Sequence, residues 1–173
     1  GPRDEPIATV TPGETVRIHC VDAFGNRITT AEEFHARGPS RPNPQTGPVF
    51  VQGAEPGDTL VVDIHEITPS RDWVLSALVK NFGGLTGTSQ TAILNDPLPE
   101  KVWFYPLKDG FVHFNDRIKI PLRPFMGTMG TSPEFESITS LSPGSHGGNM
   151  DCADVCPGNR VLFPVRVPGA FFF

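Results

Sequence analysis

Nine consecutive residues, Pro143–Asp151, carry the chain's densest set of chemically useful side chains, in the order P-G-S-H-G-G-N-M-D. They place an imidazole (His146), a carboxamide (Asn149) and a carboxylate (Asp151) within six positions. The two glycines between the imidazole and the carboxamide let the backbone adopt positive φ and approach a ligand closely. If the chain then runs extended, Asn149 and Asp151 point to the same side, because strand side chains alternate.

The chemistry of this segment has two readings. A turn that brings His146 over the side shared by Asn149 and Asp151 would supply one nitrogen and one or two oxygen ligands, a set that suits zinc or another divalent ion. In the other reading, the segment is a polar turn whose Asn and Asp side chains bond to their own backbone. The spacing is compatible with both.

Asp22 is the most informative acid in the first half of the chain. It follows a segment in which Val16, Ile18 and Cys20 would share one face of a β-strand. Asp22 would continue that apolar face, where a carboxylate is costly unless it is paired, hydrogen-bonded or bound to a metal. In the alternative reading the strand has ended, and Asp22 begins the turn D-A-F-G.

A Pro-Gly turn followed by an alternating segment occurs three times, as T-P-G-E-T-V-R-I-H-C, E-P-G-D-T-L-V-V-D-I and C-P-G-N-R-V-L-F-P-V. Each copy predicts a tight turn that leads into a β-strand. In the second copy Leu60, Val62 and Ile64 should face inward, with Asp63 and His65 outward.

The remaining segments predict short elements. A helix is expected over Thr29–Ala36, with Glu32 and Glu33 in its first turn. Strands are expected at Val49–Val51, Val102–Tyr105, Phe111–Phe114 and Ile118–Ile120, and Asp72–Phe82 is either a second helix or a strand. The expected fold is mainly β, a jelly-roll-like sandwich or barrel with two short helical pieces, and residues 1–173 would form one β-rich unit.

Composition excludes several classes of partner. The net charge is −5, and the 173 residues contain no run of Lys and Arg, which argues against binding to nucleic acid or to an anionic membrane surface. No apolar stretch approaches the roughly 20 residues that a membrane span requires. Three cysteines give no disulfide framework, so we expect a reducing compartment, the cytoplasm. Cys152 and Cys156 lack the second cysteine pair of a thiolate zinc site, so small buried side chains are the simpler reading.

Four ordered blocks resemble the acetamidase/formamidase family, and the similarity runs from about Pro6 to Phe173. The blocks are V-T-P-G-E-T-V-R-I-H-C-V-D-A-F-G-N-R-I-T, T-G-P-V-F-V-Q-G-A-E-P-G-D-T-L-V-V-D-I, I-P-L-R-P-F-M-G-T-M-G, and P-G-S-H-G-G-N-M-D followed by L-F-P-V-R-V-P-G-A-F-F-F. The resemblance implies a mainly β fold and hydrolysis of small amides such as formamide, acetamide or a lactam. It also implies a divalent metal, with zinc as the expected ion.

Within that resemblance, Asp22, His146 and Asp151 are the expected metal ligands, and Asp22 and Asn149 are the expected catalytic residues. Asn149 would orient the substrate or a ligand, and a carboxylate would accept the proton of the attacking water. The alternative function is a non-catalytic β-sandwich module that binds a ligand. An apolar, compact pocket beside Phe24, Met126 and Met129 would favour short amides over peptides.

The chain departs from the family pattern at three places. Many relatives have Gly-Gly-Gln where this chain has Phe24–Arg27, and many have His-Pro where it has Asn43-Pro44. It also ends at Phe173, before a second acidic family motif close to G-D-x-H-A-x-Q-G-D-G-E. We therefore expect a precursor cut near Phe173, a second polypeptide that completes the sheet and the site, and a higher oligomer. A truncated fragment is the alternative.

Overall fold

The computed structural model describes residues 4–37, 43–86 and 96–173, which contain ten strands and one helix. The mainly β fold is therefore confirmed. Within the described residues none of the four sheets closes into a barrel. The chain groups into two compact units. The first consists of Gly1–Asn26, Arg41–Thr68 and Pro124–Phe173, and the second of Arg27–Ser40 and Pro69–Arg123.

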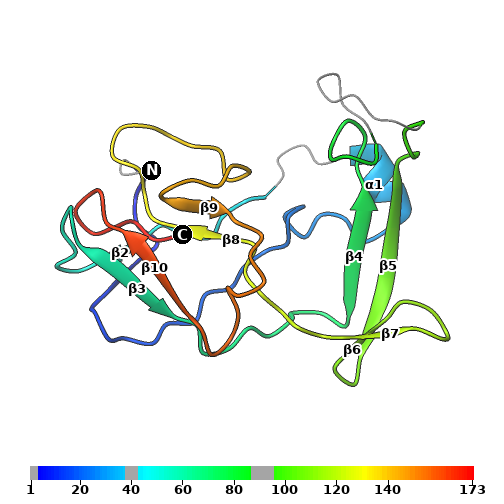
Figure 1. Cartoon of the computed structure of the whole chain (residues 1–173), viewed down its shortest axis with the longest axis horizontal. Helices are drawn as coiled ribbons and strands as arrows, with labels where there is room; N and C mark the ends of the chain where they lie inside the picture. Colours follow the sequence, from blue (N-terminus) through cyan, green and yellow to red (C-terminus); the bar gives the residue numbers. More distant parts are fainter. Residues whose placement is uncertain (1–3, 38–42, 87–95) are drawn as a thin grey trace. The chain divides into compact units, whose positions relative to one another are not determined.

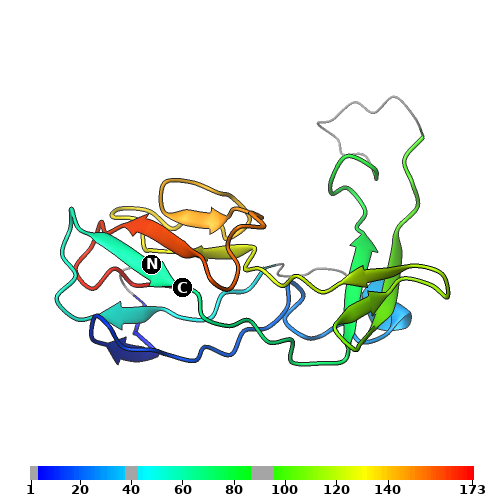
Figure 2. The same ribbon diagram turned by 60° about the horizontal axis from the view of Figure 1, so that its bottom comes forward.

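The first unit contains three two-stranded sheets (Figures 1 and 2). Strand β1 (Ala8–Val10) pairs in parallel with β2 (Val49–Val51), and β3 (Thr59–Asp63) pairs antiparallel with β10 (Arg160–Pro164). Strand β8 (Thr128–Gly130) pairs antiparallel with β9 (Gly147–Asn149). Since β8 and β9 are separated by a long connection, their pairing brings distant segments of the chain together.

The second and third Pro-Gly copies pair with each other. They form β3 and β10, with Val62 opposite Val161 and Leu60 opposite Phe163. The predicted facing of β3 is confirmed, because Ile64 directly after the strand is only 8% exposed whereas Val61 is 46% exposed. The inward side chains join the core of this unit, in which Ile64, Met129, Val155 and Phe163 are packed together.

The first Pro-Gly copy does not form the predicted strand. Val16–Cys20 lies outside every strand, and Val16 is 49% exposed instead of sharing a buried face. Strand β2, which lies against this region, is already paired on both edges. One edge is bonded to β1, and the other receives Phe172, whose carbonyl accepts from the Val49 amide at 2.7 Å. The alternating pattern is present, but among the described residues the segment pairs with no strand.

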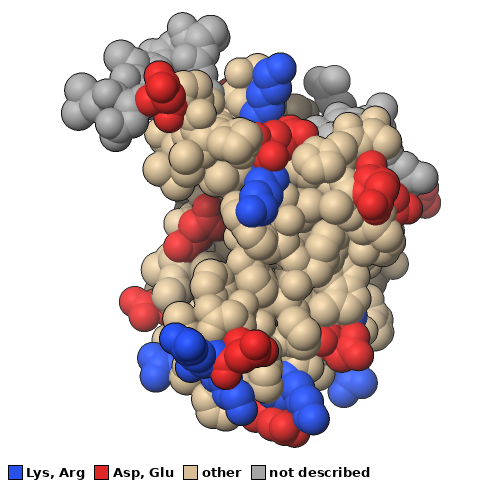
Figure 3. All heavy atoms as spheres, turned by 90° about the vertical axis from the view of Figure 1, so that its right-hand side faces the viewer, with Lys and Arg blue, Asp and Glu red and all other residues tan. Residues whose placement is uncertain are grey.

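The second unit is built on the antiparallel sheet β4–β5–β6–β7, with helix α1 (Ala31–Arg37) against β5 (Figure 1). Its strands are β4 (Trp73–Leu78), β5 (Lys101–Lys108), β6 (Phe111–His113) and β7 (Lys119–Pro121). Positive and negative side chains are interspersed on the face shown in Figure 3, around a wide uncharged area. This distribution agrees with the absence of a Lys/Arg run in the sequence.

The second expected helical piece is a strand. Of the two readings for Asp72–Phe82, the structure has β4, which pairs with β5 along its whole length from Trp73 to Leu78. Large apolar and aromatic side chains favour this outcome because they pack well on a pleated surface. The Trp73 ring, for example, meets that of Phe104 edge-on, with ring centroids 5.2 Å apart.

Helix α1 begins where the sequence predicts. The Thr30 hydroxyl caps the helix by accepting from the Glu33 amide at 3.2 Å, and the Glu33 carboxylate accepts from the Thr29 amide at 2.8 Å. Such reciprocal bonds satisfy amides that a helix start otherwise leaves unpaired. Phe34, only 1% exposed, anchors the helix, while His35 lies at the surface. Among the described residues, no helix is both long and apolar enough to cross a membrane.

Candidate functional site

The β8–β9 pair holds the motif in a backbone arrangement that excludes larger side chains. Gly147 and Gly148 have φ of 98° and 83°, a region that L side chains rarely adopt. A Cβ on Gly147 would overlap the Met129 carbonyl oxygen, and one on Gly148 would overlap that of Ser142. Strand β8, the two glycines of β9 and the two residues just after β8 are buried, and the backbones of the two strands approach closely at the glycines.

His146 is a buried imidazole, only 4% exposed. Two glycines make room for its ring, since a Cβ on Gly144 would lie 2.9 Å from Nδ1 and one on Gly148 would lie 3.1 Å from Nε2. The ring of Phe173 packs nearby, with its centroid 6.5 Å from that of the imidazole. None of the described residues forms a hydrogen bond with the His146 ring. The fold thus presents a donor or acceptor nitrogen that the protein's own described side chains do not use.

A chain of hydrogen bonds leads to Asp151. The Asn43 Nδ2 donates to Thr128 Oγ1 at 2.8 Å, and Thr128 Oγ1 donates to Asn149 Oδ1 at 2.7 Å. Asn149 Nδ2 then donates to Asp151 Oδ2 at 2.9 Å. Asn149 and Asp151 therefore meet on one side of the segment, as the sequence predicts. The Asp151 backbone has a φ of 46°, and its amide donates to Gly127 at 3.0 Å.

Asp22 begins the turn D-A-F-G, as the alternative reading predicts. The prediction that it continues an apolar strand face is wrong. Its Oδ1 accepts from the amides of Phe24 at 2.9 Å and Asn26 at 2.8 Å, while Asn26 Oδ1 accepts from the Asp22 amide at 3.0 Å. The turn reaches the β8–β9 region through its backbone, because the Ala23 carbonyl accepts from the Asn43 amide at 2.7 Å. Asp22 is thus linked to Asn149 by way of Asn43.

The expected ligands do not form a metal-binding group. In residues 4–37, 43–86 and 96–173, no three His, Cys, Asp or Glu side chains are grouped so that they could hold a metal ion. Asp22, His146 and Asp151 all lie in these ranges, so this part of the chain does not assemble them as a ligand set. Cys152 and Cys156 are free thiols in the turn before β10, but the prediction that they are buried is wrong, because Cys152 is exposed and Cys156 is half-buried.

Sequence reasoning missed the residues that hold the carboxamide in place. Asn43 had a signal, since it was one of the expected departures from the family pattern, but nothing in the pattern indicated what it contacts. Thr128 lies in a Gly- and Met-rich segment and is 9% exposed. Ser140, whose carbonyl accepts from Asn43 Nδ2 at 2.9 Å, had no signal, because a serine in a polar loop is common.

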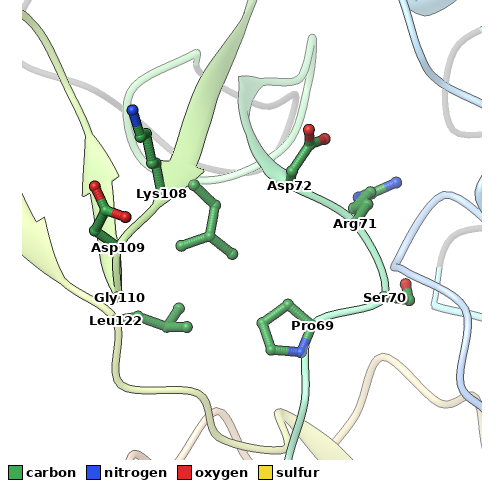
Figure 4. Close-up of a pocket in the computed structure, with 9 residues that line it drawn as sticks. Pro69, Ser70, Arg71, Asp72, Lys108, Asp109, Gly110 and Leu122 are labelled. Atoms are coloured by element: carbon green, nitrogen blue, oxygen red, sulfur yellow. The ribbon is translucent and has the colours of Figure 1, made fainter.

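Two surface hollows have linings that include none of these residues. One, of about 440 Å³, is in the second unit, with Arg71 and Asp72 on one wall and Lys108 and Asp109 on the other (Figure 4). The other, of about 420 Å³, lies in the first unit. It is lined by Ile7, Ala8, Val10, Val16, Arg17, Ile18, His19, Thr46 and Val49. Met129, expected beside a substrate pocket, is instead 7% exposed and belongs to the core.

Comparison with known proteins places these features in a family. The model of the Acetamidase/Formamidase family matches residues 2–141. The solved structure of an acetamidase from Yersinia enterocolitica is 40% identical, with a TM-score of 0.90, over 99% of this chain and 53% of its own. One from Bacillus halodurans is 33% identical, with a TM-score of 0.86, over 98% of this chain and 55% of its own.

A curated relative, the formamidase of Methylophilus methylotrophus, is 25% identical over 93% of this chain and 52% of its own length. The chain thus spans about half the length of the relatives it matches. The structural likeness continues through β9 and β10, beyond the region matched by the family model. The chain therefore belongs to the acetamidase/formamidase family.

Proposed function

We propose that the protein containing this chain hydrolyses the carbon–nitrogen bond of small amides, such as formamide, acetamide or a small lactam. The observation that carries the proposal is the likeness to solved acetamidases over nearly the whole chain, including the segment with His146, Asn149 and Asp151. Because the chain spans about half of those relatives, the activity belongs to the assembly in which the rest of the family domain is present.

The chemistry of amide cleavage sets the roles. An amide is a poor electrophile with a basic leaving group, so the site must polarise the carbonyl, activate water and move a proton to nitrogen. The exposed Asp151 carboxylate is suited to accept a proton, and Asn149 beside it is suited to orient the substrate. His146 offers a ring nitrogen that the described residues leave without a hydrogen bond. These three residues are the contribution of the β8–β9 region.

Metal dependence is a separate part of the proposal. A divalent ion, with zinc as our candidate, would act as a Lewis acid toward the amide carbonyl. The chain's own contribution would be His146 and Asp151, whose nitrogen and oxygen donors suit zinc. Because Asp22 does not join them in one group, we assign no reaction step to a metal held by this chain alone.

Ammonia release from a panel of small amides tests the proposal, with metal content measured on the same protein. We expect activity on at least one short amide and a loss of at least about 100-fold in kcat/KM in His146→Ala and Asp151→Asn. A long peptide amide should be cleaved far more slowly. Full activity in both variants would remove these residues from the mechanism, and no ammonia from any amide would favour the ligand-binding alternative.

A further variant is needed to distinguish the structural role of Asp22 in its turn from a catalytic role of its charge. Asp22→Asn keeps an oxygen that can accept from the Phe24 and Asn26 amides, because Asn favours the same kind of turn. If the Asp22 carboxylate is catalytic, this variant should fold normally and lose activity. Unchanged activity would mean that Asp22 stabilises the turn and is not catalytic.

A second polypeptide that carries the rest of the family domain remains part of the proposal, as do a higher oligomer and a cytoplasmic location. The support for the partner is the length of the relatives, of which this chain covers about half. The three free thiols support a reducing compartment. Intact-mass and native-mass measurements of the purified protein test the partner. An active, monomeric species of 18.8 kDa with no companion would contradict it.

A further inference from the structure

We propose that Asn43 and Thr128 are positioning residues, which act through a directed chain of hydrogen bonds to fix the carboxamide of Asn149 against Asp151. The effect of this chain on catalysis rests on the function proposed above. The hydrogen-bond arrangement itself does not, because it follows from donors and acceptors within the first unit. The experiment below therefore measures the two separately.

A backbone carbonyl fixes the donor-to-acceptor order of these hydrogen bonds. Asn43 Nδ2 donates to the Ser140 carbonyl oxygen at 2.9 Å, and a carbonyl oxygen can only accept. This contact fixes which end of the Asn43 carboxamide is the NH₂ group. The Ser140 hydroxyl donates in return to the Asn43 carbonyl at 2.6 Å, so the two residues hold each other. The second hydrogen of the Asn43 amide then points at Thr128 Oγ1.

The Thr128 hydroxyl continues the same donor-to-acceptor order. Its hydroxyl has one hydrogen, and because its oxygen already accepts from Asn43, the hydrogen is directed to Asn149 Oδ1 at 2.7 Å. With the oxygen of Asn149 held there, the NH₂ group must face the other way. It donates to Asp151 Oδ2 at 2.9 Å, and an ionised carboxylate can only accept. Every bond in the chain therefore has one permitted direction.

Loss of the Thr128 hydroxyl would weaken this selection, because it removes the shortest hydrogen bond to Asn149 Oδ1. Thr128 is 9% exposed, and in such surroundings polar groups interact more strongly than in water. Without the hydroxyl, only the Asp151 carboxylate and the 3.3 Å contact from Asn43 Nδ2 to Asn149 Oδ1 would orient the Asn149 amide, which would therefore be held less firmly. Both ends of the chain are also tied to backbone, since the Asn43 amide donates to Ala23 at 2.7 Å and the Asp151 amide to Gly127 at 3.0 Å.

The test compares two buried threonines in the full protein. Thr128→Val removes the relay hydroxyl, and Thr131→Val removes a hydroxyl that only donates to the Pro164 carbonyl at 2.8 Å and is 0% exposed. Both should lower Tm, because each leaves a polar partner unsatisfied. Only Thr128→Val should change the side-chain amide signals of Asn149 in NMR spectra. It should also lower kcat by about 10-fold or more, with KM changed less than about twofold. Thr128→Ser should restore both readouts.

Asn43→Gly provides a second way to break the chain if Thr128→Val folds poorly. Asn43 has a φ of 59°, which glycine adopts without strain, so this change removes the donor and keeps the backbone. We expect the same change in the Asn149 amide signals. Unchanged Asn149 signals in a folded variant, or a kcat loss no larger than that of Thr131→Val, would overturn the proposal. Altered signals in a protein that hydrolyses no amide would support the relay and refute the proposed function.

Discussion

The β8–β9 pair and the β4–β5 pair are both antiparallel, but they are held together in opposite ways. In β4–β5, large side chains from Trp73 to Leu78 face a strand rich in aromatic residues. In β8–β9, glycines allow the backbones to approach so closely that a Cβ at Gly147 would overlap its neighbours. Side-chain volume therefore stabilises the second unit, whereas the candidate site depends on missing side chains and directed polar bonds.

The largest expected effect comes from adding one methyl group to the β8–β9 pair. Gly147→Ala should destabilise the protein by about 5 kcal/mol or more, because the Cβ meets backbone atoms and φ is 98°. The matched change in the second unit is Gly110→Ala, where φ is 75° and nothing lies within 4 Å of the added Cβ. It should cost only about 1–2 kcal/mol of backbone strain. Urea denaturation measures both, and equal losses would show that crowding does not matter at Gly147.

The converse change removes volume from the second unit. Phe34→Ala should lower the free energy of unfolding by about 3–5 kcal/mol, since the ring is 1% exposed and its loss leaves a cavity. Phe82→Ala, at a ring that is 63% exposed, is the control and should stay within about 0.5 kcal/mol. Thermal unfolding of the two variants tests whether side-chain volume stabilises this region, and a small effect at Phe34 would argue against it.

A smaller effect tests the local signals that begin α1. Thr30→Ala should cost about 1 kcal/mol, because the Glu33 amide loses the hydroxyl that accepts from it. Thr30→Ser retains that oxygen and should be close to wild type. Amide hydrogen exchange in the first turn of α1 would show the loss directly. Equal exchange in both variants would mean that packing, and not the cap, defines the start of the helix.

The smallest effect concerns an exposed pair in the first unit. Hydrogen bonds from the Arg160 guanidinium, the nearer at 2.7 Å, hold the pKa of Asp63 below its usual value. The pair therefore contributes stability at neutral pH, and that contribution is lost as the pH falls through the lowered pKa. Asp63→Asn should lower Tm slightly at pH 7, and its Tm difference from wild type should vanish in acid. A difference that does not change with pH would contradict an ionic contribution, and high salt should reduce it.

Local patterns in the sequence determined much of the secondary structure. The cap at Thr30 placed α1, the turn Asp109-Gly110 placed the β5–β6 hairpin, and alternation placed the inner face of β3. These features depend on neighbouring residues only, through turn dihedral angles, capping oxygens and the period of a strand. The contact between Asn149 and Asp151 was also predicted, although β9 ends at Asn149 and Asp151 has a φ of 46°, so strand alternation does not explain it.

The tertiary structure alone decided which partners those segments find. Val16–Cys20 has the pattern of a strand, but in the described part of the chain it joins none of the sheets. Asn43 meets Thr128 across 85 positions and Asn149 across 106. Spacing along the chain does not encode such contacts, since they arise only when hydrophobic packing and strand pairing bring distant backbones together. The arrangement of the candidate site is therefore a property of the folded chain and not of its motif.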